Sequence, residues 1–386
     1  MESKPIALIC NYYILNYGSI LQSYALYEAV KREGINVDVI QYEDRATGIQ
    51  KFKILLHEKS KRLFSDDLIR KVQRKKAEQK DTNYTLEITE RKKLFSEFYN
   101  TRFQFSNKYN DITEIVADSE KYSFFLLGSD QLWGPQDLIR GYHTLEWLPE
   151  DKKRGAYATS FGVSQLPSYA EKIVSQFIPH FSGISTREKS GADIIQRITG
   201  KKAEVVLDPT LLLSKVEWEE RIPEEDLVDG KYIFSYMLGE NLEYRKKIQT
   251  FARKINCKIV AIANPEFYEL SDEKYADIYV QAGPEQFINL IRNAEYVIGD
   301  SFHMCIFSII FHKNFLVFNR YKETDNNSRN TRVKNLLEQL KLTDRYLNSV
   351  EYNIVEKFNY VIDYEQTDKI LSEWKTHSLE YLRNIL

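Results

Sequence analysis

Residues 296–318, YVIGDSFHMCIFSIIFHKNFLVF, contain the pattern that decides the fold. The short apolar run at the start of this stretch predicts a buried strand, and the Gly-Asp pair after it predicts a tight turn. An apolar helix over 301–311 and a second strand over 315–318 are expected next. Strand, turn, helix and strand in this order form the βαβ unit of a parallel sheet.

The turn of this unit carries polar residues where a ligand would bind. In open α/β sheets, ligands lie beyond the carboxyl ends of the strands, and here that edge holds Asp300, Ser301 and His303. Ser301 is the expected N-cap, which puts His303 in the first helical turn, where free N–H groups and the helix dipole favour an anion. The alternative is that His303 is an ordinary polar residue at a helix start.

Length and composition indicate a two-domain globular protein. The chain has 386 residues, a hydrophobic fraction of 43% and a formal net charge of −2, so charge gives no reason to expect a nucleic-acid partner. Its three cysteines have no CxxC spacing, and its six histidines are dispersed without a metal-ligand cluster. With no signal peptide and no apolar run of about 18 residues, we expect a cytoplasmic protein without a metal or cofactor.

The N-terminal stretch resembles the opening of a Rossmann fold. Strands are expected over 5–10 and 37–41, with a helix between them that ends at Gly34. There is no GxGxxG motif, and the loop before the helix instead offers Asn16 and its neighbours, with Gln22 one turn further on. A simple turn followed by a core helix explains the same spacing.

Residues 45–105 differ in composition from the rest of the chain. Glycine is scarce there, and 51–80 predicts an amphipathic helix rich in lysine and arginine. Such a helix suits the anionic surface of a membrane. The alternative is a solvated helical excursion that packs on its own domain.

Two further strand ends carry candidate site residues. The strand over 122–127 runs into GSDQLWGP, which places Asp130 at its carboxyl edge and Trp133 shortly after it. The strand before Arg187 ends in the same way, and an arginine at such an edge either clamps a phosphate or carboxylate or forms a salt bridge with a neighbouring acid.

The alternation of strands and helices from about 182 to 318 predicts a second parallel sheet. We therefore expect an α/β fold of two Rossmann-like domains with a central cleft, as in GT-B glycosyltransferases. The expected divisions are an N-terminal domain over 1–180 that includes the basic excursion, a C-terminal domain over 181–355, and a helical segment over 356–386 that packs back toward the N-terminal domain.

Five stretches, in the same order along the chain, resemble the motifs of the polysaccharide pyruvyl transferase family. They are NYGSILQSYAL (16–26), GSDQLW (128–133), ATSFG (158–162), TREKSG (186–191) with DPTLLL (208–213), and GDSFHMCIFSIIFHKNFLVF (299–318). The resemblance implies a GT-B-like fold and phosphoenolpyruvate (PEP) as donor. It further implies transfer of the enolpyruvyl unit to a sugar, as a cyclic pyruvate ketal, on a cell-surface glycan or an undecaprenyl-linked precursor. The basic helix over 51–80 adds the expectation of peripheral contact at the inner face of the membrane.

The resemblance also assigns residues to PEP, an anion that needs fixed cations or oriented donors. Arg187 from the TRE motif and His303 from the DSFH motif are carried over as PEP ligands, and a protonated His303 would stabilise the departing phosphate. Some members of the family carry an arginine where this chain has Ser301. Ser301 is therefore kept in the predicted PEP site, and the missing charge has four candidate sources: Arg187, Arg320, Lys313 and Arg332.

Protonation of the PEP methylene carbon and attack by a sugar hydroxyl require a carboxyl general acid/base. Asp130 is the first candidate and Asp300 the second, and capping of a turn or a helix is the alternative role of each. The acceptor sugar has predicted partners in the N-terminal domain, three that orient its hydroxyls and two that stack on its face: Asn16, Tyr17, Gln22, Trp133 and Phe161.

Two rival interpretations keep the fold and change the function. A GT-B glycosyltransferase that uses a nucleotide sugar would need an acidic residue for the ribose, for which Glu285 is the formal candidate. A non-catalytic glycan-binding relative would account for the serine at position 301.

Overall fold

The computed structural model describes residues 4–44, 47–59, 82–239, 241–262, 275–321 and 330–386. The chain divides into two compact units, which are described separately. The first comprises the described parts of Met1–Leu63, Tyr99–Leu213 and Ser372–Leu386, and the second comprises those of Phe64–Phe98 and Ser214–Leu371.

The first unit is built on a parallel sheet of seven strands in the order β3-β2-β1-β4-β5-β6-β7. Its central strands are short apolar runs, buried along their whole length, as expected for a sheet covered on both faces. The strands are β1 (Ile6–Ile9), β2 (Val37–Gln41), β3 (Phe105–Lys108), β4 (Phe124–Leu127), β5 (Arg154–Thr159), β6 (Gly183–Thr186) and β7 (Glu204–Val205).

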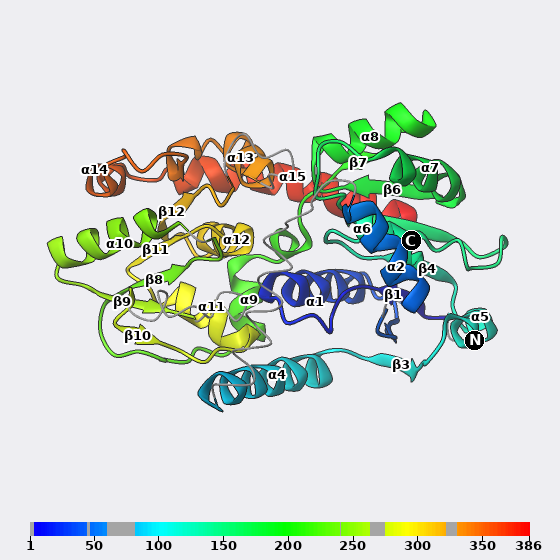
Figure 1. Cartoon of the computed structure of the whole chain (residues 1–386), viewed down its shortest axis with the longest axis horizontal. Coiled ribbons are helices and arrows are strands. Elements are labelled where there is room, and N and C mark those ends of the chain that lie inside the picture. Colours follow the sequence, from blue (N-terminus) through cyan, green and yellow to red (C-terminus); the bar gives the residue numbers. More distant parts are fainter. Residues whose placement is uncertain (1–3, 45–46, 60–81, 240, 263–274, 322–329) are drawn as a thin grey trace. The chain divides into compact units, whose positions relative to one another are not determined.

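Helix α1 (Tyr17–Arg32) of the first unit is buried along nearly its whole length, and its buried polar side chains include Ser19, Gln22 and Ser23. The core on one face of the sheet includes residues of four other α-helices, to which Ile115, Leu138, Val174 and Ile195 belong. These and the remaining α-helices, labelled in Figure 1, are α2 (Gly48–Lys59), α5 (Ile112–Ala117), α6 (Pro135–Arg140), α7 (Ser168–Phe177) and α8 (Lys189–Thr199). The short 3-10 helices are η1 (Ser119–Lys121), η2 (Tyr142–Thr144), η3 (Ile178–His180) and η4 (Pro209–Leu212).

The second unit has its own parallel sheet, of six strands in the order β10-β9-β8-β11-β12-β13. The βαβ unit predicted from the sequence is present, and its strands lie between β8 and β13. The strands are β8 (Tyr232–Tyr236), β9 (Lys258–Ala261), β10 (Ile278–Tyr279), β11 (Tyr296–Gly299), β12 (Asn314–Phe318) and β13 (Tyr346–Leu347).

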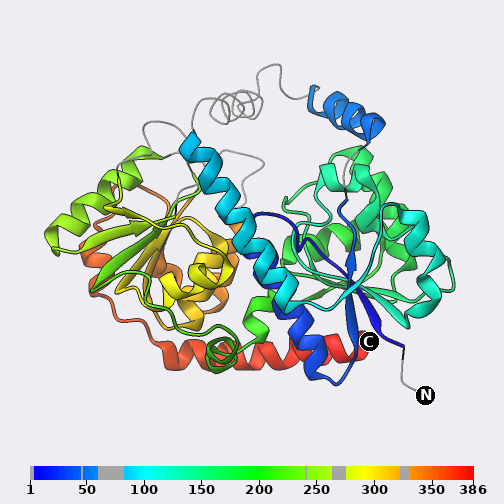
Figure 2. The same cartoon turned by 90° about the horizontal axis from the view of Figure 1, so that it is seen from below.

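Helices cover both faces of this second sheet (Figure 2). One face packs on α10 (Leu242–Lys254) and α14 (Ile354–Asn359) through a shared apolar core. On the other face the ring of Phe234 in β8 meets Phe287, which belongs to α11 (Pro284–Arg292). The other helices are α9 (Lys215–Arg221), α12 (Phe302–Ile310), α13 (Asn330–Gln339) and η5 (Thr343–Arg345).

Two long helices contribute residues to both units. They are α4 (Thr82–Arg102) and α15 (Tyr364–Ile385), and Ser372–Leu386 at the C-terminus belongs to the first unit. Ser378 accepts a hydrogen bond from the Leu207 N–H there, and Tyr381 donates one to the Ala156 carbonyl.

The division between the units differs from the boundary expected at residue 180. Strands β6 and β7 join the first sheet, so the first unit continues to Leu213 and Arg187 belongs to it rather than to a C-terminal domain. The physical reason is that a βαβ pattern is the same in both sheets, so the sequence does not say which sheet a strand joins.

Gly299 permits the close approach of strands β8 and β11. A Cβ atom at this position would lie 2.3 Å from the Tyr236 carbonyl oxygen and 2.5 Å from the Met304 sulfur. Only glycine leaves room for both neighbours. The polar turn after Gly299 therefore lies directly beside the end of β8.

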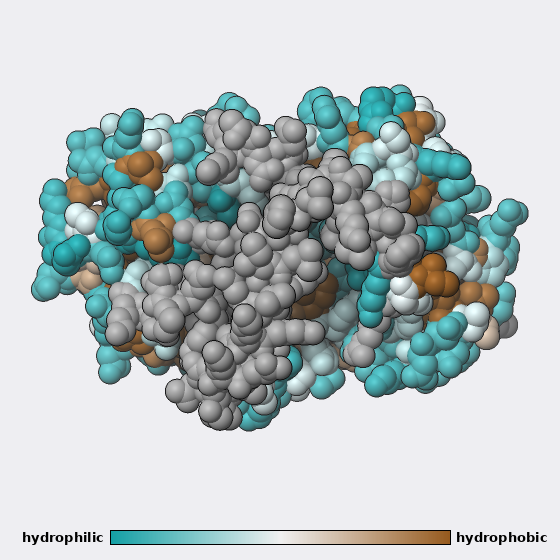
Figure 3. Space-filling view, viewed as in Figure 1, coloured by the Kyte–Doolittle hydropathy of each residue, from teal (hydrophilic) through white to brown (hydrophobic). Residues whose placement is uncertain are grey.

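No described helix combines the length and apolar character that a membrane span requires. On the described part of the face in Figure 3, hydrophilic residues predominate and apolar residues occur in small separate groups. Most of the basic helix predicted over 51–80 lies outside the described residues; α2 covers its first part.

Candidate functional site

At the carboxyl edge of the first sheet, Arg187 lies among three carboxylates. Its Nη1 donates to Oδ2 of Asp208 at 2.6 Å, its Nε lies 3.6 Å from Oε1 of Glu188, and its Nη2 lies 4.0 Å from Oδ1 of Asp130. Burial alone would lower the pKa of Arg187, but the three acids outweigh it and the pKa is raised. The salt bridge expected as an alternative is thus present, and the contact with PEP stays a prediction.

Asp130 is held in a conformation that is uncommon for a residue with a side chain. Its φ is 89°, and its carbonyl oxygen accepts a hydrogen bond from the Ser160 N–H at 2.8 Å. The Ser19 hydroxyl donates to its Oδ2 at 2.5 Å, while 16% of the side chain is exposed. Backbone strain of this kind is concentrated at functional sites, so the geometry supports Asp130 as a site residue.

Gln22 lies in the same cluster and its amide orientation is fixed. Its Oε1 accepts from the Ser129 hydroxyl at 2.5 Å and from Nη1 of Arg187 at 3.3 Å. Because a guanidinium only donates, the oxygen must face Arg187. The Nε2 group then points elsewhere, and it is buried without a hydrogen-bond partner among the described residues.

The other predicted acceptor residues have structural positions. Asn16 is exposed and caps α1 by accepting from the Ser19 N–H at 3.2 Å, and Tyr17 is buried beside it. Trp133 and Phe161 are fully buried and pack on each other in the core, with ring centroids 5.5 Å apart. Stacking of these two rings on a sugar therefore stays a prediction that their burial does not support.

His143 is a buried residue that the sequence did not single out. Both ring nitrogens lack hydrogen-bond partners among the described residues, although its carbonyl oxygen accepts from the Trp133 indole at 3.1 Å. Burial and the charge of Arg140 lower the pKa of His143 to about 3, against the opposing effect of Asp130. The folded state therefore favours the neutral imidazole.

This lowered pKa predicts a pH dependence of stability. Between pH 6.5 and 3 the unfolded chain binds a proton at His143 that the folded chain does not, so falling pH favours unfolding. Relative to wild type, a His143→Leu variant should gain about 2 kcal/mol in free energy of unfolding between pH 7 and pH 5. Urea unfolding at both pH values measures this gain, with His180→Leu, at an exposed position, as control. An equal pH dependence in His143→Leu and wild type would contradict the prediction.

In the second unit, Asp300 follows β11 and fixes the end of β8. Its Oδ1 accepts from the Leu238 N–H at 2.7 Å and its Oδ2 from the Gly239 N–H at 2.6 Å. Arg320 reaches the same residue, with Nε 3.6 Å from Oδ1 and Nη2 donating to the backbone carbonyl at 3.0 Å. Both carboxylate oxygens are thus engaged, which favours a structural role over acid/base catalysis.

Ser301 is the N-cap of α12, as predicted from the sequence. Its hydroxyl accepts from the Met304 N–H at 3.4 Å. His303 then lies in the first helical turn with 9% of its surface exposed. The positive end of the helix dipole is at this turn.

Two arginines contact residues at the start of α12, and a third lies at the end of β8. Arg320 holds Asp300, Arg332 lies over the Phe302 ring at 5.4 Å, and Arg245 donates to the Gly239 carbonyl at 2.9 Å. Four residues were candidates to replace the arginine that some family members carry in place of Ser301. Of these four, Arg320 and Arg332 lie at this edge. Lys313 instead donates to the Arg292 carbonyl, and Arg187 belongs to the other unit.

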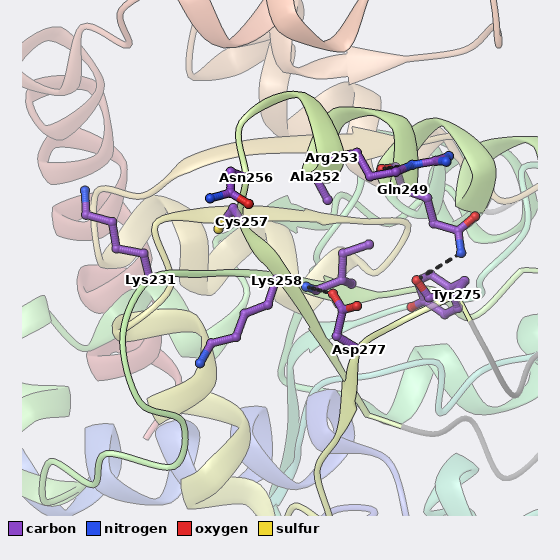
Figure 4. A pocket seen from close by; sticks show the side chains of 10 residues that line it. Lys231, Gln249, Ala252, Arg253, Asn256, Cys257, Lys258, Tyr275 and Asp277 are labelled. Atoms are coloured by element: carbon purple, nitrogen blue, oxygen red, sulfur yellow. Dashed lines mark hydrogen bonds between the residues drawn. The ribbon is translucent and has the colours of Figure 1, made fainter.

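A hollow of about 660 Å³ lies elsewhere in the second unit, near the end of α10 and the starts of β8 and β9 (Figure 4). Lys231, Arg253 and Lys258 line it, and Asp277 accepts from the Ile259 N–H at 2.7 Å. Because the sheet is parallel, this is the amino edge, opposite to Asp300. Basic side chains are usual at the C-terminal end of a helix, so we do not include the hollow in the site.

Several residues of these two edges were missed at the sequence level. Glu188 and Asp208 were inside the quoted motifs but received no role, and Arg245 lies outside every motif. The signal for Glu188 and Asp208 was their position directly after a predicted strand. Ser19 was named only as one of the neighbours of Asn16 in the first loop.

Comparisons with known proteins identify the family and the fold. A family model described as polysaccharide pyruvyl transferase matches residues 16–321, whereas a search of curated proteins gave no match. The UDP-GlcNAc 2-epimerase from Neisseria meningitidis bound to UDP-GlcNAc is similar in structure, with a TM-score of 0.50, 12% identity, and coverage of 99% of this chain and 100% of that chain. An α-glucosyltransferase in complex with UDP and a 13-mer DNA has a TM-score of 0.51, 9% identity, and coverage of 100% and 99%.

At these identities the solved structures show the fold alone, which is the GT-B-like, Rossmann-like α/β fold expected from the sequence. The family model spans most of the chain and includes all five of the stretches that carried the resemblance. The chain belongs to the polysaccharide pyruvyl transferase family, and it is a transferase of polysaccharide biosynthesis.

Proposed function

We propose that this enzyme transfers the pyruvyl unit of PEP to two hydroxyl groups of one sugar, forming a cyclic ketal and releasing phosphate. The acceptor in this proposal is a cell-surface polysaccharide or its undecaprenyl-linked precursor. The family match supports the transferase and the polysaccharide, and PEP is the donor that the resemblance implies.

The observation that carries the proposal is the opposite charge of the two sheet edges. In the second unit, His303, Arg320 and Arg332 gather at the N-terminal turn of α12, where Asp300 pairs with Arg320. Guanidinium groups and a helix N-terminus are the usual ligands of phosphate and carboxylate groups. This edge therefore suits PEP, and its two arginines provide the charge that Ser301 lacks.

The first edge has the opposite character, with three carboxylates around one guanidinium. A sugar hydroxyl can donate to the Asp130 carboxylate, and Nε2 of Gln22 is a buried donor without a partner among the described residues. This combination suits a polyhydroxylated, uncharged ligand better than an anion.

Asp130 then serves as general acid and base for the first C–O bond. In its acid form it gives a proton to C3 of PEP, using the electron pair of the double bond. A sugar hydroxyl bonds to C2, and its proton returns to the Asp130 carboxylate. The Ser19 hydroxyl fixes one carboxylate oxygen during both transfers.

Contact with a membrane and contact of Arg187 with PEP are expected from the sequence and stay predictions. Peripheral contact with a membrane rested on the helix over 51–80, most of which is outside the described residues. The contact of Arg187 with PEP is the second, because three acids already engage its guanidinium.

Phosphate release from PEP, measured with a panel of bacterial glycans, tests the proposed function. We expect release only when a suitable glycan is present, together with incorporation of labelled pyruvate into that glycan. The same panel is offered with UDP-sugars in place of PEP. Transfer from a UDP-sugar without use of PEP would show a glycosyltransferase, and glycan binding without either reaction would show a non-catalytic relative.

A further inference from the structure

Beside Asp130 lies a second carboxylate whose orientation is unusual. Glu188 occupies the N-cap position of α8, yet its side chain makes no capping bond to that helix. It is buried, and its Oε1 instead accepts from the Ser160 hydroxyl at 2.8 Å and lies 3.6 Å from Nε of Arg187. Instead of capping α8, the carboxylate of Glu188 therefore lies beside Arg187, together with Asp130 and Asp208.

Glu188 and Asp130 have matching surroundings. Each accepts a hydrogen bond from a serine hydroxyl, Ser160 and Ser19 respectively, and each lies near a different nitrogen of Arg187. The third acid of the cluster differs from both. Asp208 accepts from Nη1 of Arg187 at 2.6 Å and from the N–H and hydroxyl of Thr210 at 3.1 and 2.6 Å, so it anchors the guanidinium.

Within the described part of the chain, three acids face the Arg187 guanidinium in this cluster. Buried carboxylates need hydrogen-bond donors, and the nearby Nε2 of Gln22, itself buried, needs an acceptor. Hydroxyl groups satisfy both needs, because each one donates and accepts. The cluster is therefore suited to a ligand with neighbouring hydroxyls, which is what ketal formation requires.

We propose that Glu188 is a second catalytic carboxylate, which takes the proton of the second sugar hydroxyl. The inference rests on the proposed function. Asp130 serves the first C–O bond, which gives an open adduct that still carries phosphate. The second hydroxyl then bonds to C2 as its proton passes to Glu188. The C2–O bond to phosphate breaks, its electron pair leaves with the phosphate, and Glu188 releases the proton to solvent.

A Glu188→Gln variant distinguishes formation of the first C–O bond from formation of the second. Its substrates are PEP labelled in both carbon and phosphate and the glycan that supports release by wild type. We expect phosphate release to fall at least a hundredfold, while both labels accumulate together on the glycan. Asp130→Asn should form neither product. Glu204→Gln, on β7 of the same sheet and paired with Lys202 at 2.9 Å, is the matched control and should behave as wild type.

Ser160→Ala keeps the charge of Glu188 and removes its hydroxyl donor. The acid limb of the pH profile for phosphate release should move to higher pH in this variant, because a carboxylate without that donor holds its proton more tightly. A purely structural serine would leave the profile in place.

Phosphate release by Glu188→Gln within threefold of Glu204→Gln would overturn the proposal. Joint loss of adduct and release, as in Asp130→Asn, would overturn it as well. If Glu188→Gln does not fold, the Ser160→Ala variant decides. An unshifted pH profile of phosphate release in Ser160→Ala would then overturn the proposal. Failure of the wild-type enzyme to release phosphate with any glycan is a different result, which counts against the proposed function instead.

Discussion

We expect an Asp130→Asn variant to release phosphate from PEP roughly a thousandfold more slowly than the wild-type enzyme. An amide cannot exchange protons with C3 of PEP or with a sugar hydroxyl, so the first C–O bond is not formed. The fold should survive, because asparagine tolerates the positive φ of 89° and its amide oxygen can still accept from Ser19. Initial rates at saturating PEP, with a melting curve for each protein, measure both effects.

Asp193→Asn is the matched control for this variant. Asp193 is an exposed carboxylate on α8 that pairs with Lys189 at 2.9 Å, so its neutralisation should leave the rate unchanged. A rate for Asp130→Asn within tenfold of this control would remove Asp130 from the chemistry.

The second large effect concerns stability. Arg187→Met should lower the free energy of unfolding by about 3–5 kcal/mol, because it leaves buried carboxylates without their cation. Asp208 and Glu188 are the acids most affected, since their side chains are almost completely buried. Urea unfolding at pH 7 measures the loss.

Arg197→Met is the control for the arginine change. Arg197 pairs with Glu171 at 2.7 Å, but its side chain is 55% exposed, and exposed pairs contribute little to stability. A loss below about 1 kcal/mol in Arg187→Met, comparable to this control, would show that the cluster does not hold the first unit together.

The central βαβ unit could be predicted because its chemistry is local. A short apolar run, a Gly-Asp turn and a serine before an apolar helix specify β11, the turn and α12 without information from the rest of the chain. The N-cap role of Ser301 was confirmed for the same reason, since the hydroxyl and the N–H that it accepts from are three residues apart.

Features that depend on distant residues could not be predicted in this way. The ion pair of Arg187 with Asp208 joins residues 21 positions apart, and the bond from Ser19 to Asp130 joins residues 111 positions apart. Sequence position placed Arg187 at a sheet edge correctly, but it did not show that Asp130, after β4, and Asp208, after β7, would approach the guanidinium. The assignment of β6 to the first sheet is the same kind of information, because it depends on pairing with β5.

Aromatic residues near a motif were the least informative. Trp133 is three residues from Asp130, which suggested a sugar-stacking surface, yet its ring packs among Phe161, Phe177 and Phe181. Proximity in sequence does not determine on which side of a turn a large side chain is buried.

The most direct test of the central claim is calorimetric titration of the protein with PEP. Wild type should bind PEP, and His303→Ala should lose that binding while its melting curve stays cooperative. The control is His312→Asn, because His312 is more exposed, follows the end of the same helix, and has a φ of 53° that asparagine tolerates. PEP binding by His303→Ala that equals binding by this control would contradict a PEP site at the start of α12.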